Sequence, residues 1–279
     1  MEVIKNKVYN EERSLFSSNE LEIYNTRFIE GESPLKESSN IYLEEVTFSY
    51  KYPLWYSKNI KGNRLILEEM ARSGIWYTSN IDIIDSVIHA PKTFRRSTNI
   101  KLTNVTLHHA DETLWKCKKI KLNNIKAKGD YFGFNSEDIE INNLYLDGNY
   151  AFDGGKNIII RNSVLNSKDA IWNCENVLIE NTLINGEYLG WNSKDVTLVN
   201  CKIISHQGLC YMENVKLVNS EIIDSDLILE YSSNIDADIT SVVDSIKNPT
   251  SGIIRVKGVK ELILDPKYID VSKVKVELK

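Results

Sequence analysis

The sequence lacks the features of a membrane or secreted protein. In its 279 residues, no apolar run approaches the roughly 20 residues that a membrane-spanning helix needs. The first residues, MEVIKNKVYNEERSLF, contain acidic side chains and no continuous apolar segment, so we expect no secretory signal there. These absences predict a cytoplasmic protein that has no membrane partner.

Cysteine motifs and an excess of basic charge are also missing. The four cysteines form no CxxC pair and show no other metal-ligand spacing, which predicts free thiols in a reducing compartment. Lys and Arg number 34 against 39 Asp and Glu, for a net charge of −5. Nucleic acid is therefore not expected as a partner, because binding phosphates requires clustered cations.

The sequence does contain a repeat. An Asn or Asp followed by Ile or Val recurs at steps of 19 to 21 residues, as at Asn40, Asn99 and Asn176. The first and third residues after this anchor are apolar, and period-two alternation indicates a β-strand. The fifth residue after the anchor is Asn in most repeats: Asn104, Asn124, Asn143, Asn162, Asn181, Asn200 and Asn219.

The repeat length selects the fold. Repeats of about 20 residues are too short for a helical solenoid such as a tetratricopeptide array, which needs ~34. We predict an all-β, single-stranded, right-handed parallel β-helix of about 11–12 coils, with successive strands ~4.8 Å apart. The coils should occupy residues 19–252 of a single domain (1–279), with an N-terminal cap at 1–18 and a C-terminal cap at 253–279. The Asn row should form an internal ladder, with its amides paired from coil to coil.

These residues carry a resemblance. The coil length, the Asn row and segments such as HADETLWKC, KDAIWNCENV and GEYLGWNSK resemble the pectin-lyase-like β-helix superfamily. Over nearly the whole chain they are similar to a bacterial family of uncharacterised β-helix proteins. The superfamily resemblance implies polysaccharide cleavage, which many of its members perform. The Gly-His-Gly motif of polygalacturonase-like hydrolases is absent from the chain.

The tryptophans occupy one position of the repeat, four residues before the anchor. Arg95 and Asp153 stand in the same row, and the adjacent Phe94 and Phe152 suggest a one-residue slip at both places. Because side chains alternate along a strand, we predict that this row shares a face with the small residues two positions later and points inward. The alternative is an outward row that stacks on sugars. All five tryptophans belong to the row: Trp55, Trp76, Trp115, Trp172 and Trp191.

Acidic residues stand in the loops that precede the tryptophan segments, and consecutive coils would place these residues in one groove. Two carboxyl groups ~5–9.5 Å apart are what glycoside hydrolysis requires. The competing interpretation is that these acids are solvated residues of the loops. We predict as catalytic residues Asp130, Asp169, Glu187 and His206. We predict as substrate-binding residues Lys116, Tyr131, Asn135, Trp172, Asn173, Tyr188, Trp191, Asn192 and Tyr211.

The sequence supports a carbohydrate-active protein, either a polysaccharide or oligosaccharide hydrolase or a lyase. The alternatives are a non-catalytic β-helix that binds a glycan or a protein, and a structural scaffold whose aromatic row is only core. We expect carbohydrate as the partner and no metal or other cofactor. If the protein is a lyase, the acidic row predicts Ca²⁺ bound through oxygen ligands. The oligomeric state does not follow from the sequence.

Overall fold

The computed structural model describes residues 2–279 as an all-β parallel solenoid of about 15 turns. The predicted fold class is confirmed, with more turns than expected. Among the described residues the only helix is the short 3₁₀ helix η1 (Val271–Lys273), and no helix there has the length and apolar character to cross a membrane. The chain divides into two compact units, Met1–Tyr145 and Leu146–Lys279, which are described separately. The single predicted domain stays a prediction.

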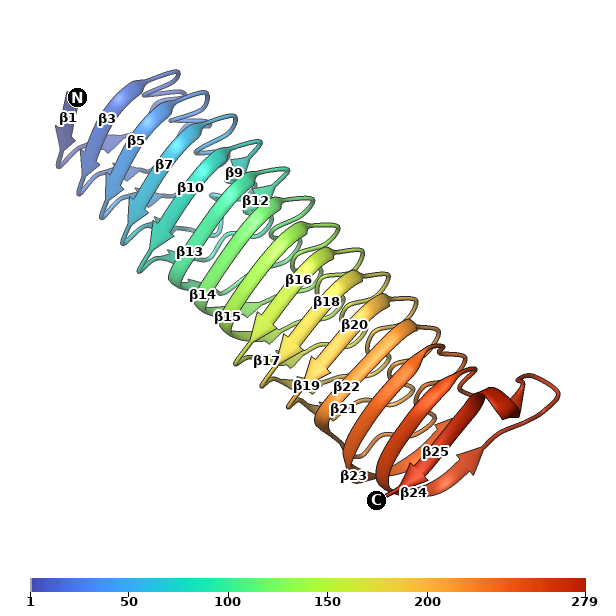
Figure 1. The fold of residues 1–279 in the computed structure, drawn as a ribbon. Coiled ribbons are helices and arrows are strands. Elements are labelled where there is room, and N and C mark those ends of the chain that lie inside the picture. The colour runs from blue at the N-terminus through green and yellow to red at the C-terminus, as the bar shows by residue number, and fades with distance from the viewer. Residues whose placement is uncertain (1) are drawn as a thin grey trace. The chain divides into compact units, whose positions relative to one another are not determined.

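In the first unit, the strand that follows each anchor pairs in parallel with its counterpart in the next coil (Figure 1). Ile60, for example, lies between Ile41 and Ile81. The long strands are β1 (Glu2–Lys5), β3 (Asn19–Tyr24), β5 (Ser39–Glu44), β7 (Lys58–Asn63), β10 (Ser79–Ile84), β13 (Thr98–Leu107) and β14 (Lys118–Lys128). The short strands are β2 (Val8–Tyr9), β4 (Arg27–Phe28), β6 (Thr47–Phe48), β8 (Ile66–Leu67), β9 (Ile75–Trp76), β11 (Val87–Ile88) and β12 (Phe94–Arg95).

The second unit follows the same plan, and β15 (Glu137–Asp147) leads into it. Val177 lies between Ile158 and Val196 in the parallel ladder. The long strands are β16 (Lys156–Arg161), β18 (Glu175–Glu180), β20 (Lys194–Val199), β22 (Glu213–Ile222), β23 (Ile235–Lys247), β24 (Gly252–Ile263) and β25 (Val274–Leu278). The short strands are β17 (Val164–Asn166), β19 (Leu183–Asn185) and β21 (Lys202–Ile204).

The ladder reaches beyond the predicted coil limits at both ends. β1 pairs in parallel with β3, so the ladder begins before residue 19. β24 pairs in parallel with β23, and β25 with β24, so it also continues past residue 252. These pairings account for the additional turns, because the two end segments form coils of their own.

The core consists of the apolar residues that alternate along the long strands. Ile60, Ile81 and Ile100 are at most 2% exposed, and burying such a side chain stabilises the fold by about 1.5–3 kcal/mol. Small buried hydroxyl residues line the core at the corner before several long strands, as Ser57 does before β7 and Ser97 before β13. Ser97 Oγ donates to the carbonyl of Ile75 (2.9 Å), so this buried hydroxyl is satisfied.

The Asn ladders lie on the outside, which corrects the predicted internal position. Asn104 and Asn124 are exposed, and Asn124 Nδ2 donates to Asn104 Oδ1 at 2.7 Å. A second ladder runs through the anchor residues, where Asn59 donates to Asn40 at 2.7 Å. All four residues have φ between 54° and 57°, the left-handed region that Asn tolerates better than most residues. The Asn side chain therefore faces solvent while its backbone turns the corner.

Candidate functional site

The tryptophan row faces outward, which contradicts our preferred inward orientation. Trp115 is partly exposed, whereas Leu114 before it and Cys117 after it are buried. The reason is the backbone of Lys116, whose φ of 54° is left-handed. One left-handed residue breaks the period-two alternation of a strand. Trp115 and Lys116 therefore both point outward, and Cys117 returns to the core.

The same geometry recurs in the second unit. Trp172 is partly exposed between buried Ile171 and exposed Asn173, and φ is 50° at Ile171 and 52° at Asn173. The alternative sequence interpretation, an outward aromatic row, therefore describes the molecule. Asn173 occupies a position whose left-handed backbone suits Asn, as do Asn135 and Asn192 in their own coils.

Four of the five indoles are fixed from coil to coil by their N–H groups, and Trp55 Nε1 donates to the carbonyl of Ser73. Trp76 Nε1 donates to the carbonyl of Lys92 at 2.7 Å. Trp172 Nε1 donates to the carbonyl of Tyr188 at 2.9 Å, and Trp191 makes the same bond to Gln207 at 2.6 Å. A partly buried indole needs such a partner, so these rings have defined orientations.

In the first unit the rings form a column with an arginine inside it. The Trp55 and Trp76 rings stack with centroids 5.2 Å apart and planes 10° apart. The guanidinium carbon of Arg95 lies 4.5 Å from the Trp76 centroid and 5.0 Å from the Trp115 centroid. Phe134 packs beyond Trp115 at 4.2 Å. Both faces of Trp76 and of Trp115 are therefore covered.

Arg95 is in register with the tryptophans, so the predicted slip is wrong. Parallel bridges join it to Trp76 and to Trp115, and Phe94 beside it is buried in the core. Its guanidinium also donates to Glu112 at 2.7 Å. The sequence contained a signal for this contact, because Arg95 is a cation in an aromatic row and stands about one repeat from Trp76 and from Trp115.

In the second unit the column has an open end. Trp172 stacks on Trp191 with centroids 5.9 Å apart and planes 18° apart. Tyr211 follows Trp191 at 5.0 Å. Asp153 holds the matching position in the preceding coil, and its carboxylate accepts a hydrogen bond from Asn173 Nδ2 at 3.0 Å. Within the second unit no ring or cation covers the face of Trp172 on that side.

Asp169 is the buried carboxyl beside this open end. Its residue is 3% exposed, and its Oδ1 has no hydrogen-bond partner among the described residues. Burial raises the pKa of Asp169 above its ordinary value. Lys168 opposes this shift, whereas the negative charges of Glu187 and Asp153 reinforce it. A carboxyl with a raised pKa can hold a proton and donate it at higher pH than usual.

Glu187 and His206 lie in successive coils, as predicted, because the N–H of Tyr188 donates to the carbonyl of His206 at 3.0 Å. Each also has a polar partner of its own. Glu187 forms an ion pair with Lys168 at 3.4 Å, and His206 Nδ1 contacts the carboxylate of Asp226. Both side chains therefore already have partners at the surface.

The predicted site residues are divided between the two units. The second unit contains Asp169, Trp172, Asn173, Glu187, Tyr188, Trp191, Asn192, His206 and Tyr211. The first contains Lys116, Asp130, Tyr131 and Asn135. There Tyr131 packs 6.1 Å from Trp115, and the N–H of Asp130 donates to Asp111 at 2.7 Å. Their catalytic and binding roles stay predictions.

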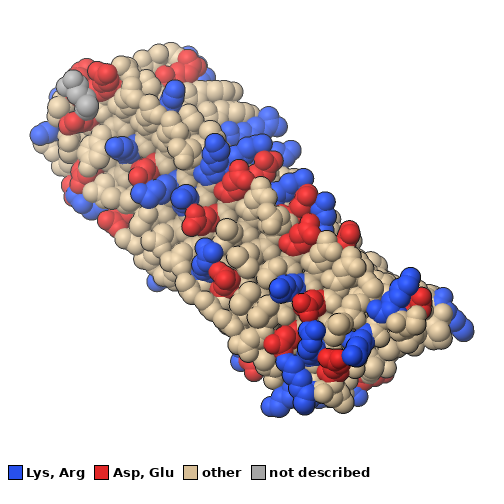
Figure 2. Space-filling model, in the orientation of Figure 1, with Lys and Arg blue, Asp and Glu red and all other residues tan. Residues whose placement is uncertain are grey.

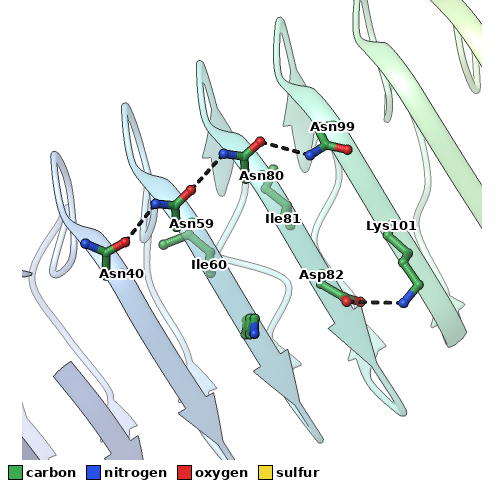
Figure 3. Close-up of a pocket in the computed structure, with 9 residues that line it drawn as sticks. Asn40, Asn59, Ile60, Asn80, Ile81, Asp82, Asn99 and Lys101 are labelled. Carbon is green, nitrogen blue, oxygen red and sulfur yellow. Dashed lines mark hydrogen bonds and ion pairs between the residues drawn. The ribbon is translucent and has the colours of Figure 1, made fainter. Parts of the chain in front are cut away.

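A shallow hollow of about 460 Å³ lies on the sheet face of the first unit (Figure 3). The figure shows the ladder of anchor amides along one side and, farther down the strands, the ion pair between Lys101 and Asp82 at 3.2 Å. The residues that line the hollow are Asn40, Asn59, Ile60, Lys61, Asn80, Ile81, Asp82, Asn99 and Lys101. The hollow thus presents amides and paired charges rather than a cluster of catalytic groups.

The described residues contain no group of three or more His, Cys, Asp or Glu side chains arranged to hold a metal ion. The four cysteines are buried and unpaired. Burial raises the pKa of the Cys117 and Cys210 thiols to about 12, which leaves little reactive thiolate near neutral pH. These thiols are packing residues of the core.

The chain matches, over residues 2–277, the model of a family described as a protein of unknown function (DUF3737). It belongs to this family. Among curated proteins, none matches the chain.

Similar solved structures have varied roles. PfbA, a surface adhesin of Streptococcus pneumoniae, is 10% identical with a TM-score of 0.44, covering 87% of this chain and 84% of its own. The A-module of the Azotobacter vinelandii mannuronan C-5 epimerase AlgE4 is 10% identical with a TM-score of 0.27, and the match covers 99% of this chain and 87% of the module. HetL of Nostoc sp. strain PCC 7120, a pentapeptide repeat protein, is 12% identical with a TM-score of 0.19, and the match covers 91% of this chain and 88% of HetL. At these scores the likeness carries no inference about activity.

Proposed function

We propose that the protein is a carbohydrate-binding β-solenoid, in which a sugar ring stacks on the open face of Trp172. The observation that carries the proposal is the open end of the Trp172–Trp191 column. Both faces of Trp76 and of Trp115 lie against a ring or a guanidinium, whereas within the second unit this face of Trp172 borders only the position of Asp153. A flat apolar face edged by polar groups is suited to a sugar, whose ring is apolar on its faces and polar at its rim.

The polar partners for such a ring surround Trp172. Asp153 and Asn173 are hydrogen-bonded to each other at 3.0 Å, and together they offer carboxylate oxygens and an amide. Sugar hydroxyls both donate and accept, so a carboxylate and an amide side by side satisfy two of them. Trp172 is also held in place by its bond to the Tyr188 carbonyl, so the binding surface exists before the ligand arrives.

The test compares two tryptophans that differ in how their faces are covered. Oligosaccharides that bind the wild-type protein on a glycan array are titrated by calorimetry into Trp172→Ala and Trp76→Ala. We expect Trp172→Ala to weaken binding at least ~10-fold, as loss of a central aromatic contact does. Trp76→Ala should leave the affinity unchanged, because both faces of Trp76 are already covered. If no glycan binds, or both variants bind like wild type, the proposal is wrong.

A second candidate function is glycoside hydrolysis, and Asp169 is the observation that favours it. A buried carboxyl with a raised pKa is the usual form of a general acid, and hydrolysis would also need a second carboxylate, for which Glu187 is the candidate. Incubating a bound oligosaccharide with wild type and Asp169→Asn distinguishes the two functions. New reducing ends that form with wild type but not with Asp169→Asn would support hydrolysis. An unchanged oligosaccharide would support binding without hydrolysis.

A further inference from the structure

The turns of the first unit carry an unusual concentration of positive charge. Segments 51–58, 71–78 and 91–98 contain six Lys or Arg residues and no Asp or Glu, although the chain has a net charge of −5. Figure 2 shows several blue side chains, with red ones among them, along the upper right edge of the molecule, on the side where Figure 1 places β9 and β12. We call this region the basic aromatic surface; its cations are Lys51, Lys58, Arg72, Lys92, Arg95 and Arg96.

Three of these cations have no ionic partner within the first unit. Lys58, Arg72 and Arg96 are exposed and lack an ion pair, whereas Lys51 pairs with Glu32 at 3.0 Å. The guanidinium of Arg96 contacts only the ring of Tyr77, at 6.0 Å. An excess of unpaired cations produces a positive local field, which attracts an anionic partner.

Exposed aromatic residues lie between the cations. The Tyr56 and Tyr77 rings stack with centroids 4.7 Å apart, and these two residues are 51% and 36% exposed. Beneath them is the Trp55–Trp76–Arg95 part of the column. Trp, Tyr and Arg are the residue types enriched at the energetic centres of protein–protein interfaces.

We propose that the basic aromatic surface binds an acidic protein segment. Single-stranded nucleic acid would need free ring faces on which bases stack. A neutral sugar would also need such a face. Here both faces of Trp76 and Trp115 are covered. The Tyr56 and Tyr77 rings stack on each other, and cations of Lys36 and Arg96 also lie over these two rings. What the surface offers is ring edges, tyrosine hydroxyls and the guanidinium groups of Arg72 and Arg96, which fit carboxylates in bidentate pairs. The proposal is independent of the sugar site in the second unit.

The probe is a fluorescently labelled random copolymer of glutamate and tyrosine. Its binding to the full chain is measured by anisotropy, in competition with unlabelled polygalacturonate and oligothymidylate. We expect the copolymer to bind and the double variant Arg72→Glu/Arg96→Glu to weaken it at least ~10-fold, because charge reversal opposes the partner's carboxylates. The matched control is Lys126→Glu, an exposed lysine on β14 of the same unit, and it should change the affinity less than ~2-fold.

Circular dichroism on all variants checks that they fold, which is expected because Arg72, Arg96 and Lys126 are exposed. The proposal is overturned if the copolymer does not bind or if Lys126→Glu weakens binding as much as the double variant. It is also overturned if polygalacturonate or oligothymidylate binds the surface as tightly as the copolymer does. Either polymer would then be the better description of the partner.

Discussion

Replacing Arg95 by Met tests the energetics of the aromatic column in the first unit. The substitution keeps an apolar stem between Trp76 and Trp115 and removes the guanidinium. Two cation–π contacts at a partly exposed site are each worth about 0.5–1 kcal/mol. The ion pair with Glu112 (2.7 Å) adds about 0–1 kcal/mol. Arg95 Nε is buried without a partner, which offsets part of this gain. We therefore expect the free energy of unfolding to fall by about 1–2 kcal/mol.

The assay is urea unfolding followed by tryptophan fluorescence, in a background where Trp172 and Trp191 are replaced by Phe. The signal then comes from the first unit alone, which matters because solenoids can unfold in stages. The control is Arg96→Met, which loses only one contact at 6.0 Å and should cost less than about 0.5 kcal/mol. Equal stability of the Arg95 and Arg96 variants would refute the view that the guanidinium holds the column together.

Substitutions at three other positions test separate parts of the structure. Burial raises the pKa of Asp169, so the folded state loses stability as the pH rises from the pKa of the unfolded carboxyl through that of the folded one. Asp169→Asn should therefore unfold at a higher urea concentration than wild type at pH 7. The difference should vanish below about pH 4, where the carboxyl is protonated in both states. Asn99→Gly keeps the left-handed turn but loses the hydrogen bond to Asn80 (2.9 Å), which should lower the free energy of unfolding by about 0.5–1.5 kcal/mol. Asn99→Ala should lower it by about 1 kcal/mol more, because Ala is strained in the left-handed region. Thermal denaturation of both variants measures the difference. Gly186→Ala, with φ of 156° and a Cβ that would lie 2.1 Å from the Ser167 carbonyl oxygen, should lower the free energy of unfolding by more than about 2 kcal/mol; a variant as stable as wild type would contradict the described turn.

The repeat in the sequence was sufficient to predict the fold. The anchor spacing and the apolar alternation after it correspond to the parallel long strands, in which Ile60, Ile81 and Ile100 stack. The end segments were predicted as caps because their spacing departs from the repeat. Parallel pairing tolerates that departure, since β24 and β25 join the ladder without an Asn anchor.

The direction of the tryptophans could not be predicted from alternation. The rule of period two assumes an extended backbone, and the residue after each tryptophan in these turns is left-handed, at Lys116 and at Asn173 for example. The same mechanism explains the external Asn ladders. Asn was interpreted as a core ladder residue, whereas its tolerance of positive φ places it on the corners, where its side chain meets solvent.

The candidate site was predictable in its location but not in its chemistry. The neighbouring coils of Asp169, Glu187 and His206 follow from the repeat length. Lys168 and Asp226 also stand one repeat from Glu187 and His206, but the repeat length does not show that these side chains contact each other. The open face of Trp172 was missed as well, because Asp153 was recognised in the tryptophan row but attributed to a one-residue slip.

The central claim, that a sugar stacks on Trp172, is tested most directly with single-tryptophan variants. One variant keeps Trp172 and the other keeps Trp76, with the remaining four tryptophans replaced by Phe in each. An oligosaccharide that binds the wild-type protein is added while the emission spectrum and its quenching by acrylamide are recorded. We predict that Trp172 emission shifts and is protected from acrylamide, and that Trp76 emission does not change. An unchanged Trp172 signal with bound sugar, or a change at Trp76 instead, would contradict the account.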